Sequence, residues 1–294
     1  MVDFEVPDVD YTRYTNRQLM TIPVVVLAIA LVVLSGWYVV TGAPVNQGID
    51  FTGGTEMTVQ TDTPREDIES QFDPAPTSIQ SVTNQDNRYI LTFKASSESD
   101  QDFSTQAREN LQPDDGQDVV LSSQTVSANF GGSTQRTALF GVGLAFLGMT
   151  ILAFLLFRTF IPGLGIVLSA FSDMVVPLAL MNVFGINLSL GTVAALLMLI
   201  GYSVDSDILL TNHILRRSGG FYESTYQAMR TGVTMTLTSL SAMAVMAIVA
   251  FIFRIDLLAS IGLVLVFGLA TDLMNTYMFN VSLLRWYKIG GVEA

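Results

Sequence analysis

The sequence contains no cysteine, a single histidine and few charged residues. Without cysteine, disulfide bonds, iron–sulfur clusters and thiolate chemistry are excluded. The single histidine, His213, stands near the end of an apolar block, where we expect an interfacial position rather than a metal or proton role. Neither a P-loop pattern nor a nucleophile–base constellation occurs, so we expect no enzyme, no cofactor and no metal.

What the chain has instead is apolar residues, which make up 50% of it against 14% charged residues. They fall in six blocks of about 20 residues, and at about 1.5 Å per residue each can cross a hydrocarbon core of about 30 Å. The first block is not a cleavable signal, because its charge-free run is of spanning length and an acidic polar tail precedes it. The predicted membrane helices are 19–41, 137–157, 162–184, 188–214, 233–253 and 257–287.

Basic residues in the short loops indicate the orientation of these helices. If the helices alternate in direction, eight basic residues fall on one side, whereas the other side has only Arg254 in its short loops. The eight are Arg13, Arg17, Arg158, Arg216, Arg217, Arg230, Arg285 and Lys288. The positive-inside rule therefore places the tails 1–18 and 288–294 in the cytoplasm and a long polar insert, 42–136, outside the cell membrane.

The insert is strongly acidic. It carries 15 Asp or Glu against five Lys or Arg, so its net charge of −10 accounts for most of the chain's −12. Such a surface can bind cationic partners, but it is also typical of proteins adapted to very high salt, where the self-repulsion is screened. We favour salt adaptation, and the sequence pI of about 4.3 argues against nucleic-acid binding.

The insert also has strand and helix signals in the order βαββαβ. Two positions with Ser or Thr followed three residues later by an acid are typical of helix starts, and they predict helices at 63–72 and 99–112. Strands are predicted at 48–60, 78–83, 88–94 and 118–127, with a turn at 84–87. This order predicts a ferredoxin-like α+β domain, inserted after the first helix of a polytopic α-helical membrane protein with six transmembrane helices.

Four aspartates lie inside the predicted membrane helices, where an ionisable side chain is costly and by default marks an ion path or a switch. They are Asp173, Asp205, Asp207 and Asp272. Asp205 and Asp207 lie about 200° apart on a helix that turns about 100° per residue, so they cannot face the same neighbour. Asp205 is the deeper of the two and is the main candidate for a protonatable centre. The alternative is that these aspartates make structural hydrogen bonds between helices.

Other polar side chains on the same helices could serve the aspartates as partners. They are Ser203, Ser206, Thr234, Thr238, Ser241 and Asn275. With them, the fourth, fifth and sixth helices are predicted to assemble an interior of acids and hydroxyls. The alternative, particularly for the hydroxyls of the fifth helix, is ordinary contact between membrane helices.

Two separated motifs resemble those of one protein family. The run GIDFTGGT at 48–55 contains Gly48, Asp50, Gly53 and Gly54, and the run GYSVD at 201–205 contains Asp205. Both are similar to signatures of SecF, the smaller subunit of the SecD–SecF protein-export complex. The segments 172–173 and 187–190 resemble further positions of that family. The chain departs from the bacterial pattern Gly-Tyr-Ser-x-Asn-Asp, because Asp205 and Ser206 stand at its last two places.

The resemblance implies an accessory subunit of the Sec translocase, akin to the resistance–nodulation–division transporters. Its partners would be a SecD-like subunit, a SecY-type channel, the exported polypeptide and membrane lipid. Ion flow through the membrane aspartates would drive motion of the external domain, with the ion, proton or sodium, left open. The acidity suits an archaeal member, and since archaea lack the SecA motor, coupling to that ATPase is not implied.

Three alternatives remain open from the sequence. The turn at Gly53 and Gly54 is either a hinge between the insert and the membrane or a simple bend that needs positive φ. A half-transporter for small molecules or lipids would share the same membrane architecture. A non-transporting scaffold for membrane-protein insertion would tolerate neutralisation of Asp205.

Overall fold

The computed structural model describes residues 11–82, 87–94, 102–113, 118–216, 220–253 and 255–290. The chain forms two compact units, one of Met1–Asn46 with Phe140–Ala294 and one of Gln47–Leu139. Much of the two predicted tails, most of the turn at 84–87, the predicted helix start at Ser99, and Arg217 and Arg254 lie outside the described residues.

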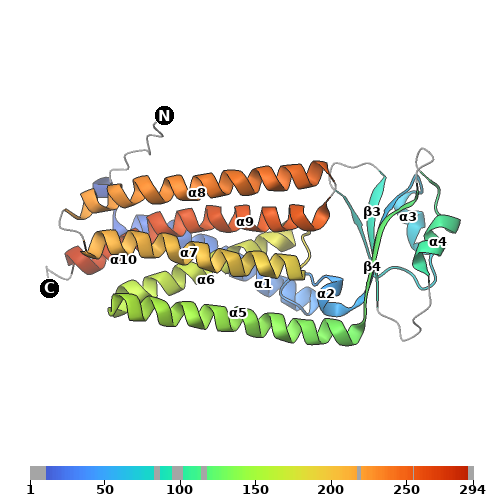
Figure 1. Cartoon of the computed structure of the whole chain (residues 1–294), viewed down its shortest axis with the longest axis horizontal. Helices are drawn as coiled ribbons and strands as arrows, with labels where there is room; N and C mark the ends of the chain where they lie inside the picture. Colours follow the sequence, from blue (N-terminus) through green and yellow to red (C-terminus); the bar gives the residue numbers. More distant parts are fainter. Residues whose placement is uncertain are drawn as a thin grey trace. The chain divides into compact units, whose positions relative to one another are not determined.

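Six helices in the described part of the chain are long and apolar enough to cross a membrane (Figure 1). The first five are α1 (Asn16–Thr41), α5 (Ala128–Phe157), α6 (Phe160–Phe184), α7 (Leu190–Arg216) and α8 (Phe221–Ile252). The sixth is continuous and consists of α9 (Asp256–Met274), the π-helical η3 (Asn275–Asn280), α10 (Val281–Arg285) and the π-helical η4 (Trp286–Gly290). A 3-10 turn, η1 (Tyr11–Arg13), precedes α1.

Local signals fix the ends of the helices. Thr15 and Gln18 form a capping box at the start of α1, with hydrogen bonds of 3.3 and 3.0 Å between each side chain and the other residue's N–H. Gly42 at φ 80° ends α1 and Gly185 at φ 68° ends α6, because glycine adopts the left-handed conformation without steric cost. The polar residues 128–136 and 221–232 continue α5 and α8 beyond the predicted apolar spans.

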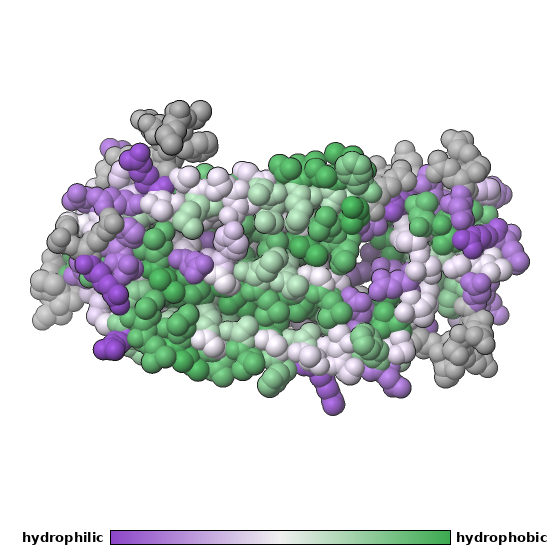
Figure 2. All heavy atoms as spheres, viewed as in Figure 1, coloured by the Kyte–Doolittle hydropathy of each residue, from purple (hydrophilic) through white to green (hydrophobic). Residues whose placement is uncertain are grey.

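The helices of the first unit divide into inner and outer ones. In the most apolar part of α6 and α7, 61% and 50% of the residues are buried, whereas α1, α5 and α8 bury 17% or less. The outer helices expose large apolar side chains such as Val39, Phe140 and Ile252. On the face seen in Figure 2, hydrophobic residues cover much of the middle of the helical unit. This surface suits lipid, and the inner helices hold the polar site.

The second unit is a small α+β domain. Its elements are α2 (Ile49–Thr52), β1 (Gly54–Gln60), α3 (Arg65–Ile68), η2 (Glu69–Gln71), β2 (Ser78–Ser81), β3 (Arg88–Phe93), α4 (Phe103–Asn110) and β4 (Val120–Val126). The four strands form one antiparallel sheet in the order β2-β3-β1-β4, with Met57 opposite both Leu91 and Ser123. The predicted ferredoxin-like order and the inserted position are confirmed.

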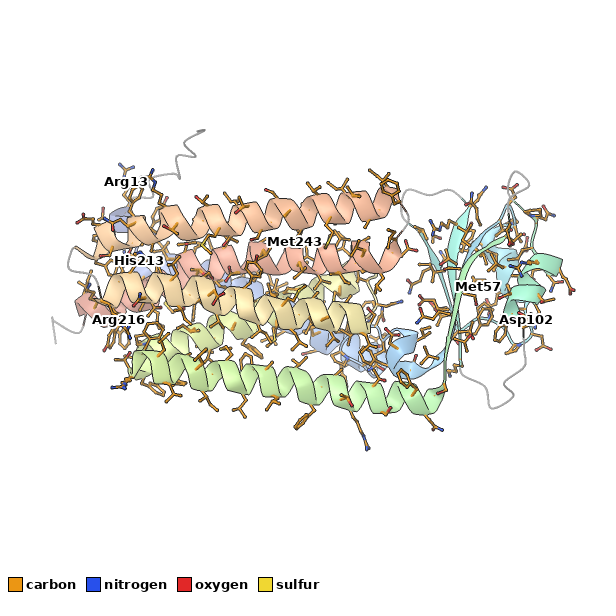
Figure 3. The ribbon with its side chains drawn as sticks, in the orientation of Figure 1. Arg13, Met57, Asp102, His213, Arg216 and Met243 are labelled. Carbon is orange, nitrogen blue, oxygen red and sulfur yellow. The ribbon has the colours of Figure 1, made fainter. Side chains whose placement is uncertain are left out.

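Apolar side chains between the sheet and its helices form the core of this unit. Met57 is buried on the central strand β1 (Figure 3), and the ring of Phe93 stacks on that of Phe103 from α4 at a centroid distance of 4.1 Å. Ile68 from α3 is also fully buried in this cluster. The alternation of β1 and β3 thus places their apolar side chains against the short helices.

Two local predictions in this unit were wrong. Residues Ile49–Thr52 form a helical turn instead of continuing the strand, because Gly53 at φ 70° reverses the chain before β1 begins. The capping box predicted from Thr63 does not form, since its hydroxyl accepts the Gln112 N–H at 3.0 Å. The next helix is capped by Asp102 itself, so α4 begins at Phe103.

Candidate functional site

Three aspartates from three helices lie in the interior of the helical unit. Asp173 on α6, Asp207 on α7 and Asp272 on α9 are each 1% exposed or less. Hydroxyl and amide groups of neighbouring helices contact their carboxyl groups. Burying a carboxyl group is costly unless it is hydrogen-bonded, so the cluster depends on these polar partners.

Asp173 links α6 to α7 and η3. The hydroxyl of Ser203 donates to Oδ2 and the side-chain amide of Asn275 donates to Oδ1, both at 2.6 Å. Ser169, one turn earlier on α6, lies 3.5 Å from Oδ2. Both carboxyl oxygens therefore have partners.

Among the described residues, hydrogen bonds reach only one of the two carboxyl oxygens of Asp207. Its Oδ1 accepts from the hydroxyl of Thr276 at 2.8 Å and from the amide of Asn280 at 2.5 Å. Its Oδ2 is buried and has no partner among the described residues. That oxygen is where a proton can be held without breaking an existing hydrogen bond.

Asp272 is joined to Asp207 through hydroxyl groups. Its Oδ1 accepts from Ser206 at 2.8 Å and lies 3.3 Å from the hydroxyl of Thr276, and these two hydroxyls are 3.2 Å apart. A hydroxyl has one proton and two lone pairs, so Thr276 can donate to one carboxylate while accepting from another group. The bridge therefore has alternative hydrogen-bonding states that depend on which carboxyl is protonated.

The π-helical η3 directs the amides of this network. In an α-helix, residues five apart point about 140° away from each other. In η3 the wider turn allows Asn275 and Asn280 to reach Asp173 and Asp207. Such π-helical turns are rare overall, and those that occur often lie at functional sites.

Asp205, the main candidate from the sequence, lies elsewhere. It is exposed on α7 and lines a hollow of about 320 Å³ at the surface between α7 and α8. The hollow is also lined by Tyr202, Ser206, Leu209, Gly232 and Thr236. Across it, the hydroxyls of Ser239 and Tyr202 are hydrogen-bonded at 3.0 Å. The two neighbouring acids therefore face opposite sides, as their angle predicts, but Asp207 is the one buried inside the chain.

The other predicted polar residues divide in the same way. Ser203, Ser206 and Asn275 belong to the buried network. By contrast, Thr234, Thr238 and Ser241 lie on the exposed side of α8, where each hydroxyl donates to a carbonyl of its own helix. The acid-and-hydroxyl interior is thus built by α6, α7 and the last helix, and the prediction that α8 contributes this hydroxyl stripe was wrong.

The sequence prediction missed Ser169 and Asn280. Ser169 lies one turn before Asp173, the ordinary spacing for a partner on the same helix face, and that spacing could have identified it. Asn280 had the weaker signal of an amide in an apolar helix, five residues after Asn275.

The glycine pair of the other unit is held by close backbone contacts. Gly53 and Gly54 have φ of 70° and 122°. A Cβ on Gly53 would lie 2.6 Å from Cα of Ala128, and one on Gly131 would lie 2.7 Å from N of Gly53. Gly48 caps the helical turn α2, whose partly buried Asp50 is in its first turn. The glycines thus permit close packing, and a hinge at this place stays a prediction.

Comparisons with known proteins agree on one family. Residues 106–289 match the model of the family "Protein export membrane protein SecD/SecF, C-terminal", and residues 38–64 match the "SecD/SecF GG Motif". The protein-export membrane protein SecF of Haloferax volcanii is 63% identical over 292 residues, 99% of both chains. That of Haloquadratum walsbyi is 60% identical over 294 residues, again 99% of both chains. These relatives also support adaptation to high salt.

A solved structure shares the fold. The crystal structure of SecDF, a translocon-associated membrane protein from Thermus thermophilus, aligns with a TM-score of 0.72 at 21% identity. The alignment covers 96% of this chain and 39% of that longer chain. From the matched family models and the two relatives, the chain belongs to the SecF family of protein-export membrane proteins, as a multi-pass membrane subunit.

Proposed function

We propose that this subunit couples proton movement through its buried aspartates to the export of polypeptides, together with a SecD-like partner beside a SecY-type channel. The observation that carries the proposal is the network of Asp173, Asp207 and Asp272. These carboxyl groups connect three separate helices, α6, α7 and α9. A change of charge at one of them changes which helix packing is favoured, as a two-state switch requires.

One feature favours the proton over sodium as the coupling ion. The hydroxyls of Thr276 and Ser206 connect Asp207 to Asp272, which suits a relay of protons.

Exposed polar side chains on α7 and α8 support a contact with the SecD-like partner. Asp205 is exposed on α7, and Thr234 and Thr238 are exposed on α8. A carboxyl group facing lipid is costly, whereas one that faces another protein or lines a water-filled path is tolerated. We therefore assign Asp205 to the contact with the SecD-like subunit, separate from the internal network.

The orientation proposed from the basic residues fits the helical unit. Arg13 and Arg216 lie at the same end of the bundle, with His213 near them (Figure 3). With that end in the cytoplasm, both termini are cytoplasmic and the α+β domain is external, where the exported polypeptide emerges.

Pulse-chase export of a signal-peptide-bearing protein in depleted cells tests the function. Wild type, Asp207→Asn, Asp205→Asn and, as a control, the exposed Asp67→Asn are supplied for rescue. We expect wild type and Asp67→Asn to restore export and Asp207→Asn to leave it much slower, because an amide side chain cannot take up and release a proton.

Three outcomes would contradict parts of the proposal. Full rescue by Asp207→Asn would make the network structural. Export that is stopped by a sodium ionophore but not by a protonophore would show that sodium, and not the proton, is the coupling ion. Export that is unaffected by depletion would remove the export role and favour a half-transporter for small molecules or lipids.

A further inference from the structure

Strand β4 is an open edge of the antiparallel sheet. It lies at one end of the order β2-β3-β1-β4 and pairs with β1 from Gly54 to Val59. No strand among the described residues pairs with its other side. All five residues from Leu121 to Thr125 are exposed, on both faces of the strand.

The part of this edge from 122 to 126 lacks the usual protection. Natural sheets blunt their edges with short strands, charged side chains, proline or β-bulges, because a free edge recruits other chains. The register shift in the β1–β4 pairing lies between Thr58 and Val59, so residues 122–126 pair with β1 in regular register. The opposite edge strand, β2, has only four residues, but β4 has seven with the sequence VLSSQTV. It carries neither a charge nor a proline, although the surrounding insert has a net charge of −10.

The main-chain groups that β4 presents can be identified from its pairing with β1. The hydroxyls of Thr55 and Thr125 are 2.9 Å apart, which fits the close side chains of a non-hydrogen-bonded pair. In such a pair the N–H and C=O groups point away from the partner strand. The main-chain groups of Thr125, and by alternation those of Ser123, therefore point outward.

We propose that β4 binds an extended segment of the exported polypeptide as an added strand, an inference that rests on the proposed function. Main-chain hydrogen bonds are the same for every sequence, and small uncharged side chains such as Ser122 and Gln124 impose little selection. An export subunit needs this property because its substrates share no sequence.

The position of β4 in the chain connects this binding to the membrane part. Only Ser127 separates the end of β4 from the start of α5. The neighbouring strand β1 begins directly after Gly53, whose backbone packs against Ala128 at the start of that helix. A segment bound along β4 therefore acts on the residues that continue into a membrane helix.

Photo-crosslinking in the full chain tests this site. A photoreactive amino acid replaces Ser123 on β4 or, as a control, the exposed Ser70 in η2, in membranes carrying an export-arrested polypeptide. We expect the polypeptide to crosslink at least about fivefold more from position 123 than from position 70. Two further variants are tested with the probe moved to Gln124. Ser123→Pro removes an outward N–H, whereas Ser123→Lys keeps the N–H but protects the edge with a charge. Both should reduce crosslinking and slow export.

Each other outcome overturns the inference. Crosslinks from position 123 to another membrane subunit would make β4 a subunit contact. Equal crosslinking from positions 123 and 70 would remove the site. If wild type rescues export in depleted cells while Ser123→Lys exports normally and crosslinks fully, this inference fails and the proposed function stands.

Discussion

The hydroxyl of Tyr11 donates a 3.0 Å hydrogen bond to the main-chain carbonyl of Tyr277, 266 residues later in the chain. Tyr277 lies within η3, the π-helical segment that directs Asn275 and Asn280 to the buried carboxyl groups. Burial raises the pKa of the Tyr11 hydroxyl, so it remains a neutral donor. Arg285 holds this turn in place through the Tyr11 carbonyl at 2.8 Å. The N-terminal turn therefore braces the helix segment that supplies the amides of the network.

Tyr11→Phe is expected to weaken this brace. It leaves the Tyr277 carbonyl without that donor in a buried place, and losing one such hydrogen bond costs about 0.5–1.5 kcal/mol. Thermal unfolding of the purified full chain in detergent should show a lower midpoint, and the rate of export should fall because η3 is less well held. The control is Tyr14→Phe, whose side chain is exposed. Equal midpoints and export rates for the two variants would show that the brace contributes nothing.

Thr276→Val is expected to disconnect Asp207 from Asp272. Valine has the shape of threonine but lacks the hydroxyl that reaches both carboxyl groups, at 2.8 and 3.3 Å. We expect proton-driven export in membrane vesicles to slow several-fold while the protein still folds. Thr271→Val is the matched control, because this buried hydroxyl donates to the carbonyl of Phe267 in its own helix. Identical rates for the two variants would exclude a relay through Thr276.

Local signals in the sequence were sufficient for the order of elements. The six apolar runs and the alternation of strands with capped helices predict the membrane helices and the ferredoxin-like insert, because each depends on neighbours along the chain. The failures have a long-range origin. Thr63 has the spacing of a cap, but its hydroxyl is used by Gln112, 49 residues away, which sequence spacing cannot reveal.

The site was predicted in part, for a physical reason. Asp173, Asp207 and Asp272 were identified because charge in an apolar helix is costly anywhere along it. The choice between Asp205 and Asp207 needed the direction of each helix face, and depth along the helix does not give it. Asn280 was missed because an α-helix would turn it away from Asn275, and a π-helical segment is not readable from composition.

The pH dependence of the α+β domain should depend on Asp102, the cap of α4. Its carboxylate accepts the Thr105 hydroxyl at 2.6 Å and the Thr105 N–H at 3.2 Å, and these bonds lower its pKa. The stabilisation is therefore complete above the pKa of unfolded aspartate, about 3.9, and is lost as the pH falls through the lower folded value.

Asp102→Ser tests that dependence, since serine also caps helices but does not titrate. As the pH is lowered from about 4.5 to 2, we expect the ratio of the pepsin cleavage rate of wild type to that of Asp102→Ser to rise. This range brackets the ordinary aspartate pKa. Comparison at each pH removes the change in pepsin's own activity. A constant ratio of cleavage rates would show that the cap does not titrate in this range.

Gly53→Ala should be among the most damaging small substitutions in the α+β unit. Alanine at φ 70° and ψ 169° costs about 1–3 kcal/mol from the backbone conformation alone, because only glycine adopts this region readily. In addition, its Cβ would lie 2.6 Å from Cα of Ala128, a backbone atom that cannot rotate away. The matched control is Gly132→Ala, because an added Cβ there meets nothing within 4 Å and alanine favours the helix.

Substitutions at Gly53 and Ala128 also distinguish the two possible roles of the glycine pair, close packing and a hinge. If close packing is its purpose, Gly53→Ala lowers the unfolding midpoint and export together, and a compensating change at Ala128 to glycine recovers part of both. If Gly53 is a hinge, Gly53→Ala slows export while the midpoint stays near that of wild type, and Ala128→Gly does not help. Measuring both quantities on the single and double variants distinguishes the two, because a packing clash is relieved from either side whereas lost backbone freedom is not.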